Sequence, residues 1–220
     1  MMASTAVTFK DFFLMSGEAV GIFVIGLIVG IVGVIRNQKF KPKWSPSTER
    51  RFVEQHSQIH ELLTEMRVTV RACRCLVFQL HNGGSFADGT SIKRFSVTHE
   101  SCDTTIPSIL LDSQDVLLTR YMDMVAVMDT QSSRIIKTDS LSPSAFRSGL
   151  EINNVEYFTV TPLKCLDGIT PLGFVFCHWC SAEPLDAIEK EGISQDKLEQ
   201  VISETAHEIN THLAYNAGKK

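Results

Sequence analysis

The sequence lacks the short motifs that mark the common catalytic sites. It contains no nucleophile elbow, no phosphate-binding loop, no zinc-binding helix of the zincin kind and no pair of carboxylates at catalytic spacing. It also has no internal repeat and no low-complexity tract. These absences predict a protein that is not an enzyme and that needs no cofactor.

An excess of positive charge is absent as well. The formal net charge is −4, and residues 36–51 are basic, so the distal part of the chain is acidic. Because binding to nucleic acid phosphates needs a basic surface, nucleic acid is excluded as the main partner. The six cysteines show no spacing typical of a small secreted domain, which favours a compartment where they stay reduced.

Charge is almost missing from residues 12–35, where Glu18 is the only charged side chain. At a rise of ~1.5 Å per residue, a helix over this run spans about 36 Å, enough to cross a bilayer. A cleaved signal peptide is the alternative interpretation. The run is longer than a signal core, and Lys10 is the only basic residue before it. Both features favour a retained transmembrane helix with the lipid bilayer as a partner.

The glycines of this expected helix predict that it self-associates, and the basic residues after it predict its orientation in the membrane. Small residues on one face allow close helix approach, which predicts a homodimer or a higher oligomer. The positive-inside rule predicts a single-pass membrane protein whose C-terminal domain is cytosolic. The glycines are Gly26, Gly30 and Gly33, and the basic residues that follow are Arg36, Lys39, Lys41 and Lys43.

A helix is expected from Ser45-Pro46 onward, because serine caps helix N-termini and proline is tolerated at the first position. Its stripe of residues at heptad spacing consists of Phe52, His56, Ile59, Leu63, Met66 and Val70. Two interpretations fit a stripe of this length. The helix either pairs with a second copy as a signalling stalk or packs on the sheet of its own domain.

The remaining pattern predicts an α+β domain. Strands are expected at 72–80, 92–100, 155–166 and 172–180, with a weak strand at 134–139. Helices are expected at 107–127, at 142–150 and after Ser194. These elements form an antiparallel sheet of about five strands with the first and last helices on one face. The expected parts are a tail at 1–11, the transmembrane helix at 12–35, a linker at 36–46, the α+β domain at 47–215 and a tail at 216–220.

The final hairpin, TVTPLKCLDGITPLGFVFCHW, resembles the closing strands of GAF domains. The stretch CLVFQLHNGGSF resembles the start of membrane-anchored GAF-like proteins of tailed phages. The resemblance implies a GAF/PAS-like domain that acts as a sensing or docking module for a small molecule or a protein. A second resemblance, in the order of span, helix and α/β domain, is to the large holins of T-even phages. It implies the alternative function, a lysis protein whose span oligomerises and whose soluble domain regulates timing.

The GAF resemblance also implies a ligand pocket, since GAF domains commonly bind small molecules between the sheet and the crossing segment. Carried over by position, the pocket would have an aromatic lining and polar edges. The same aromatic residues suit a filled core without a ligand, and this alternative stays open. The expected ligand-binding residues are Phe78, Phe95, Phe158, Phe174, His81, Asn82, Thr98 and Thr161.

Two further groups of residues have side chains that could bind a metal ion or act as acid and base. Cys177, His178 and Cys180 have a metal-ligand spacing, but residues three apart on a strand point to opposite faces, so buried structural cysteines are favoured and no metal site is predicted. His81, His99 and Glu100 form a conceivable acid–base group. A structural role is favoured, in which His81 and Asn82 bond to the turn backbone.

Overall fold

The structure is a computed structural model that describes residues 46–217 except 86, 88, 90, 166, 167, 169 and 170, with side chains described from 49 to 214. The chain divides into two units, Met1–Arg50 and Arg51–Lys220. The fold below is that of the second unit, together with the first residues of the helix that enters it.

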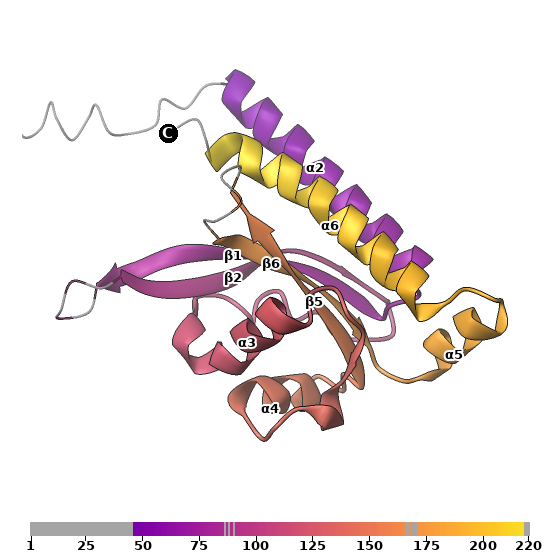
Figure 1. Ribbon diagram of the computed structural model, residues 1–220. Helices are drawn as coiled ribbons and strands as arrows, with labels where there is room; N and C mark the ends of the chain where they lie inside the picture. Colours follow the sequence, from indigo (N-terminus) through magenta and orange to yellow (C-terminus); the bar gives the residue numbers. More distant parts are fainter. Residues whose placement is uncertain are drawn as a thin grey trace, which may run out of the picture. The chain divides into compact units, whose positions relative to one another are not determined.

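A six-stranded sheet in the order β3-β2-β1-β6-β5-β4 forms the centre of the fold, and every neighbouring pair of strands is antiparallel (Figure 1). The four long strands confirm the strands predicted from alternating and apolar sequence patterns. In chain order the elements are α2 (Pro46–Thr69), β1 (Arg74–Ser85), β2 (Ser91–Cys102), β3 (Val116–Leu117), η1 (Leu118–Tyr121), α3 (Met122–Thr130), β4 (Ile136–Lys137), η2 (Thr138–Ser140), α4 (Ala145–Ile152), β5 (Tyr157–Lys164), β6 (Pro171–Trp179), α5 (Glu183–Lys190) and α6 (Gln195–Ala217).

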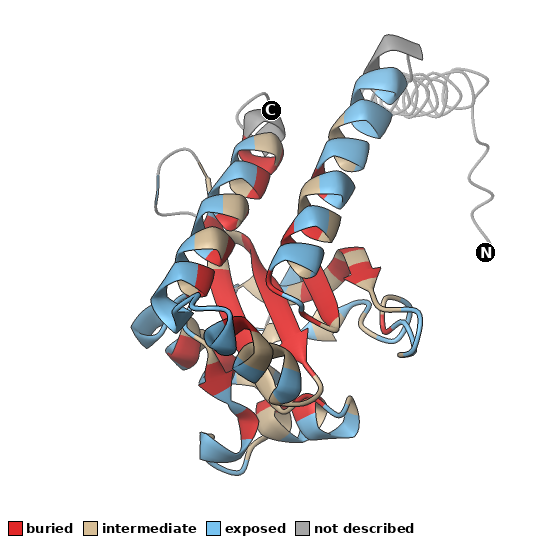
Figure 2. Cartoon of the chain, turned by 90° about the vertical axis from the view of Figure 1, so that its right-hand side faces the viewer, coloured by how far each residue is buried: buried red, intermediate tan, exposed pale blue. Residues whose placement is uncertain are grey.

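The first and last helices, α2 and α6, lie side by side over one face of the sheet (Figure 1). Figure 2 shows the buried residues of both helices on the faces toward the strands and exposed residues on their outer faces. Along the stripe of α2, Ile59, Leu63 and Val70 are fully buried, whereas Phe52 near the outer end is 57% exposed. The stripe therefore packs on the sheet of its own domain.

The opposite face of the sheet is covered by α3, α4 and the segment between β2 and β3, which we call the crossing segment. Together they enclose a second apolar core (Figure 1). Strand β6 contributes to both cores because its side chains alternate. Val175, Cys177 and Trp179 belong to the helix-side core, while Phe174 and Phe176 belong to the crossing-side core. Strand β6 therefore contacts both cores.

The helix predicted for 107–127 forms only in its last part. Residues 107–115 are turns and loop, with the Glu100 carboxylate accepting from the backbone N–H groups of Ile109 and Leu110, each at 3.0 Å. The helix does not form here because the following residues pair with β2: Val97 N–H donates to the Ser113 carbonyl at 3.0 Å, and Val116 stands opposite Phe95. Asp115 also has a φ of 56°, which lies outside the right-handed helical region. Pairing with a strand distant in sequence therefore overrides the local helical pattern.

Smaller differences concern helix ends. The predicted start at Ser142 is moved, because Ser144 is the N-cap of α4 and accepts from Arg147 N–H at 3.2 Å. The helix expected after Ser194 is confirmed as α6, whereas α5 was not predicted.

The membrane predictions need correction. None of the helices among the described residues is long and apolar enough to cross a bilayer. The predicted fold class joined a transmembrane helix to the α+β domain, and it is corrected to the α+β domain alone, which the structure describes. The predicted single-pass membrane localisation is not supported by the helices that the structure describes. The predicted span at 12–35, the glycines Gly26, Gly30 and Gly33, and the basic residues from Arg36 to Lys43 lie outside the described residues.

At Gly173 the backbones of β1 and β6 leave no room for a side chain. A Cβ added there would lie 1.9 Å from the Phe78 carbonyl oxygen, and backbone cannot yield as a side chain can. We expect Gly173→Ala to lower the free energy of unfolding by about 3 kcal/mol, near the upper end for overpacking. Chemical denaturation measures the change. The control is Gly149→Ala in α4, where the nearest atom would be 3.9 Å away and stability should not fall. Equal stabilities of the two variants would contradict the close approach.

Candidate functional site

A cavity of about 320 Å³ lies on the crossing side of the sheet. Strands β1, β2 and β6 form its floor, and its other walls are formed by residues of the 109–116 segment, among them Asp112, together with η1, α3 and α4. Its volume is at the lower end of the range of small-molecule sites. The lining includes Phe78, Phe95, Tyr121, Gly149, Phe174, Phe176 and His178.

The walls of this cavity are built from interlocked aromatic rings. Phe78 stacks on Phe174 with ring centroids 4.9 Å apart, and Phe95 meets Phe174 edge-on at 5.4 Å. Tyr121 continues the cluster at 5.6 Å from Phe95. These rings come from alternate positions of adjacent strands, so the pleat of the sheet presents them on one face. The cavity is therefore walled largely by aromatic rings and is mostly apolar.

One end of the cavity is polar. His178 lines it, and Arg74 lies directly across the β1–β6 ladder from His178. Arg74 is 1% exposed, and its Nε lies 3.2 Å from Oε1 of Glu100, whose side chain is 3% exposed. The Nη2 group of Arg74 donates to the Pro107 carbonyl at 2.6 Å. A buried ion pair thus stands behind His178 and joins the sheet to the crossing segment.

Several nitrogens at this polar end make no hydrogen bond in the described part of the chain, including Nε of Arg74, which still lies within ion-pair distance of Glu100. Among the described residues, neither Nη1 of Arg74 nor Nδ1 of His178 has a hydrogen-bond partner. Burial, and to a smaller extent the charge of Arg74, lowers the pKa of His178 to about 3, so the imidazole is neutral at pH 7. Buried polar groups are normally paired, so a group left unpaired marks a place where another molecule can bond.

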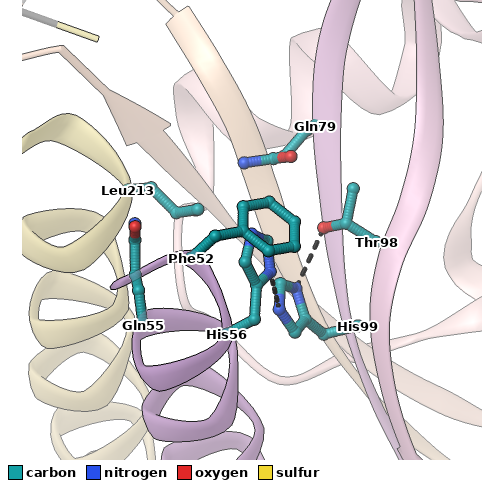
Figure 3. Close-up of a pocket in the computed structure, with 7 residues that line it drawn as sticks. All are labelled: Phe52, Gln55, His56, Gln79, Thr98, His99 and Leu213. Carbon is teal, nitrogen blue, oxygen red and sulfur yellow. Dashed lines mark hydrogen bonds between the residues drawn. The ribbon is translucent and has the colours of Figure 1, made fainter. Parts of the chain in front are cut away.

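A second hollow, of about 660 Å³, lies on the helix side, between the outer ends of α2 and α6 and the strands β1 and β2 (Figure 3). Figure 3 shows the Phe52 ring over His56, and His56 against His99. His56 Nδ1 and His99 Nε2 are 2.8 Å apart, and His99 Nδ1 lies 3.0 Å from Thr98 Oγ1. Burial lowers the pKa of His56, while burial and then the charges of His56 and His60 lower the pKa of His99 to about 4.

The structure divides the predicted ligand-binding residues among several places. Phe78, Phe95 and Phe174 are brought together in the crossing-side cavity. Phe158 is buried next to it, against Phe146 at 5.3 Å, and does not line it. The role of the whole set stays a prediction.

The four predicted polar residues lie elsewhere. Thr98 lines the helix-side hollow, because side chains alternate along a strand and its neighbour Val97 faces the crossing side. Thr161 bonds to Ser133 at 2.9 Å, and both are buried. His81 and Asn82 are exposed in the β1–β2 hairpin, where His81 Nε2 lies 2.9 Å from Ser96 Oγ.

Several cavity residues were not predicted, among them Tyr121, Gly149 and Phe176. The spacing of Phe174, Phe176 and His178 carried a signal, since residues two apart on a strand share a face. Tyr121 and Gly149 carried none, because they come from the part of the chain whose helices were misplaced or shifted.

The sheet places the side chains of the Cys177–Cys180 stretch on different faces. Cys177 is fully buried in the helix-side core, whereas His178 lines the cavity on the other face. Cys177 Sγ lies 3.4 Å from Cys75 Sγ, and burial followed by this neighbour raises the pKa of Cys75. Burial and the Cys180 thiol raise the pKa of Cys73 to about 12, which disfavours the thiolate that binds metals. In the described part of the chain no group of three or more candidate ligands could hold a metal ion.

Comparison with solved structures decides the fold. A far-red cyanobacteriochrome photoreceptor is similar over 88% of this chain and 100% of its own, with 11% identity and a TM-score of 0.51. A red/green cyanobacteriochrome in its green-light-absorbing state is 12% identical over 74% of this chain and 96% of its own, with a TM-score of 0.50. The fold is GAF-like. The phycocyanobilin-bound GAF domain of a cyanobacterial phytochrome is 17% identical over 74% of this chain and 91% of its own, with a TM-score of 0.45.

At these identities the likeness shows the GAF-like fold alone, and it confirms that part of the resemblance seen in the sequence. No protein-family model matches the sequence, and no curated protein does. The phage and holin resemblances find no support in these comparisons.

The buried histidines predict a pH dependence of stability. In the unfolded chain a histidine titrates near 6.5, whereas His99 titrates at about 4 in the native protein. Between these values the unfolded chain binds more protons, so the free energy of unfolding falls as the pH falls. From pH 7 to pH 5 we expect His99 to remove about 2 kcal/mol. Denaturant titrations at each pH measure this. His99→Gln keeps a side-chain hydrogen-bonding group and should show a shallower dependence; an unchanged dependence would contradict a buried neutral His99.

Proposed function

We propose that the GAF-like domain is a non-enzymatic module that binds a small molecule in the crossing-side cavity. The observation that carries this proposal is a cavity of about 320 Å³ with aromatic walls and, at one end, a buried His178 nitrogen without a hydrogen-bond partner among the described residues. Sites for small molecules combine an apolar lining with few polar groups that fix orientation, and this cavity has both features.

The fold supports the same proposal. A GAF domain of similar fold is bound to phycocyanobilin in its own structure, at the low identity given above. The proposal for this chain rests on the cavity and takes no particular ligand from that protein.

The geometry of His178 supports a binding role rather than catalysis. Catalytic nucleophiles are activated by a base within hydrogen-bond reach. His178 Nδ1 has no such partner in the described part of the chain, and at pH 7 the imidazole is neutral because burial lowers its pKa to about 3. The cavity therefore holds no nucleophile–base pair assembled around this histidine.

Strand β6 offers a route from the cavity to the helix layer. Phe174 and Phe176 face the cavity, while the next residues along the strand face α2. Trp179 Nε1 donates to the Val70 carbonyl at 3.0 Å, and Cys177 Sγ lies 4.0 Å from Met66 Sδ. A ligand that shifts β6 would thereby move contacts at the end of α2, which is how we propose that binding is sensed.

Closing the cavity tests the proposal. Gly149 lines it, and an added Cβ would meet only the Tyr121 ring at 3.9 Å, so Gly149→Trp places an indole in the cavity space. Fragments with aromatic rings would be screened against the full chain by ligand-observed NMR. We expect the fragments that bind to lose about tenfold or more in affinity in Gly149→Trp, a loss of about 1.4 kcal/mol.

Gly149→Ala is the matched control. It should keep the affinity of the wild type and gain up to about 1 kcal/mol of helix stability. Circular dichroism checks that both variants are folded. The proposal is overturned if no fragment binds the wild type, or if the fragments bind Gly149→Trp as tightly as they bind the wild type.

A further inference from the structure

The polar end of the cavity has hydrogen-bond donors left over. Both oxygens of Glu100 are occupied, since they accept from Ile109 N–H and Leu110 N–H at 3.0 Å and from the Ser108 hydroxyl. The Pro107 carbonyl is taken by Arg74 Nη2. The acceptors near the ion pair are thus in use, while Arg74 Nη1 has no partner among the described residues.

His178 adds a second unused nitrogen on the same face of the sheet. It is 5% exposed, lines the cavity and stands opposite Arg74 in the β1–β6 ladder. A neutral imidazole carries its hydrogen on either nitrogen, so Nδ1 can act as a donor. Two buried nitrogens on neighbouring strands therefore lack a hydrogen-bond partner in the described part of the chain. His178 lines the end of the cavity, and Arg74 lies behind it.

We infer that the ligand is an aromatic or alicyclic carboxylic acid, whose carboxylate lies at the His178 end and whose ring system lies along Phe78, Phe95 and Phe174. This inference rests on the proposed function, because it names the ligand class of the same cavity. A carboxylate oxygen accepts from His178 Nδ1–H, and the Arg74 guanidinium behind it stabilises the negative charge. Hydrogen bonds with a charged partner are the stronger ones. The aromatic walls of the cavity favour a ring system, which can pack against their faces and edges.

A matched series of probes tests this class. We would measure the dissociation constants of 2-naphthylacetate, 2-naphthylacetamide and 2-(2-naphthyl)ethanol for the full chain at pH 7 by calorimetry. The acid should bind about tenfold or more tightly than the alcohol, with the amide between them. In the protein labelled with ¹⁵N-histidine, binding of the acid should shift the His178 Nδ1 resonance.

Three variants locate the effect. His178→Phe keeps a ring in the cavity wall and removes the donor, so the acid should lose its advantage over the alcohol. Arg74→Lys keeps a cation beside Glu100 and removes Nη1, so the advantage should shrink. His81→Phe, at an exposed position of the hairpin, is the control and should leave it unchanged. Denaturant unfolding checks that each variant is folded.

The outcomes separate this inference from the proposed function. If the acid and the alcohol bind equally, or if the preference for the acid survives in His178→Phe, the carboxylate assignment is overturned while the cavity remains a ligand site. If the naphthyl probes fail to bind but other fragments bind in the cavity, the ligand class is again overturned alone. If nothing binds in either experiment, both are overturned.

Discussion

The buried ion pair between Arg74 and Glu100 determines how the crossing side of the sheet is built. Removing two charges from water is unfavourable unless their remaining bonding groups are satisfied. Glu100 meets this condition by accepting from the backbone N–H groups of Ile109 and Leu110 and from the Ser108 hydroxyl, and Arg74 donates to the Pro107 carbonyl. The crossing segment is thereby held against the sheet. The cavity lies between this segment and the strands because the ion pair fixes the segment there.

Strand β6 links that arrangement to the helices on the other face. It approaches β1 closely at Gly173, where a Cβ would collide with backbone, and its register sets Arg74 opposite His178. Because side chains alternate along a strand, Phe174 and Phe176 enter the cavity wall while Val175 and Cys177 enter the core below α2. The cavity wall and the core below α2 are therefore separated by the thickness of one strand.

Patterns of short range predicted much of this fold, and interactions of long range account for the failures. The sequence patterns correctly indicated strands β5 and β6. Of the two interpretations left open for the stripe on α2, the structure shows packing on the sheet of its own domain. The first part of the helix expected at 107–127 did not form, because Ser113 and Val116 pair with strand β2, which no local pattern reveals. Thr98 was assigned to the same cavity as Phe95, although residues three apart on a strand face opposite sides of the sheet. Phe158 has the expected direction, but Phe146 covers it.

The two hollows differ in what their polar groups still need, and this difference decides which of them is the better ligand site. On the helix side, His99 uses both ring nitrogens, Nε2 with His56 and Nδ1 with Thr98. A ligand there would have to replace bonds that the protein already makes, and such an exchange contributes little free energy. On the crossing side, the unpaired nitrogens of Arg74 and His178 already bear the cost of burial. An acceptor that pairs with them removes this cost, so the same hydrogen bond contributes more to affinity there than in the helix-side hollow.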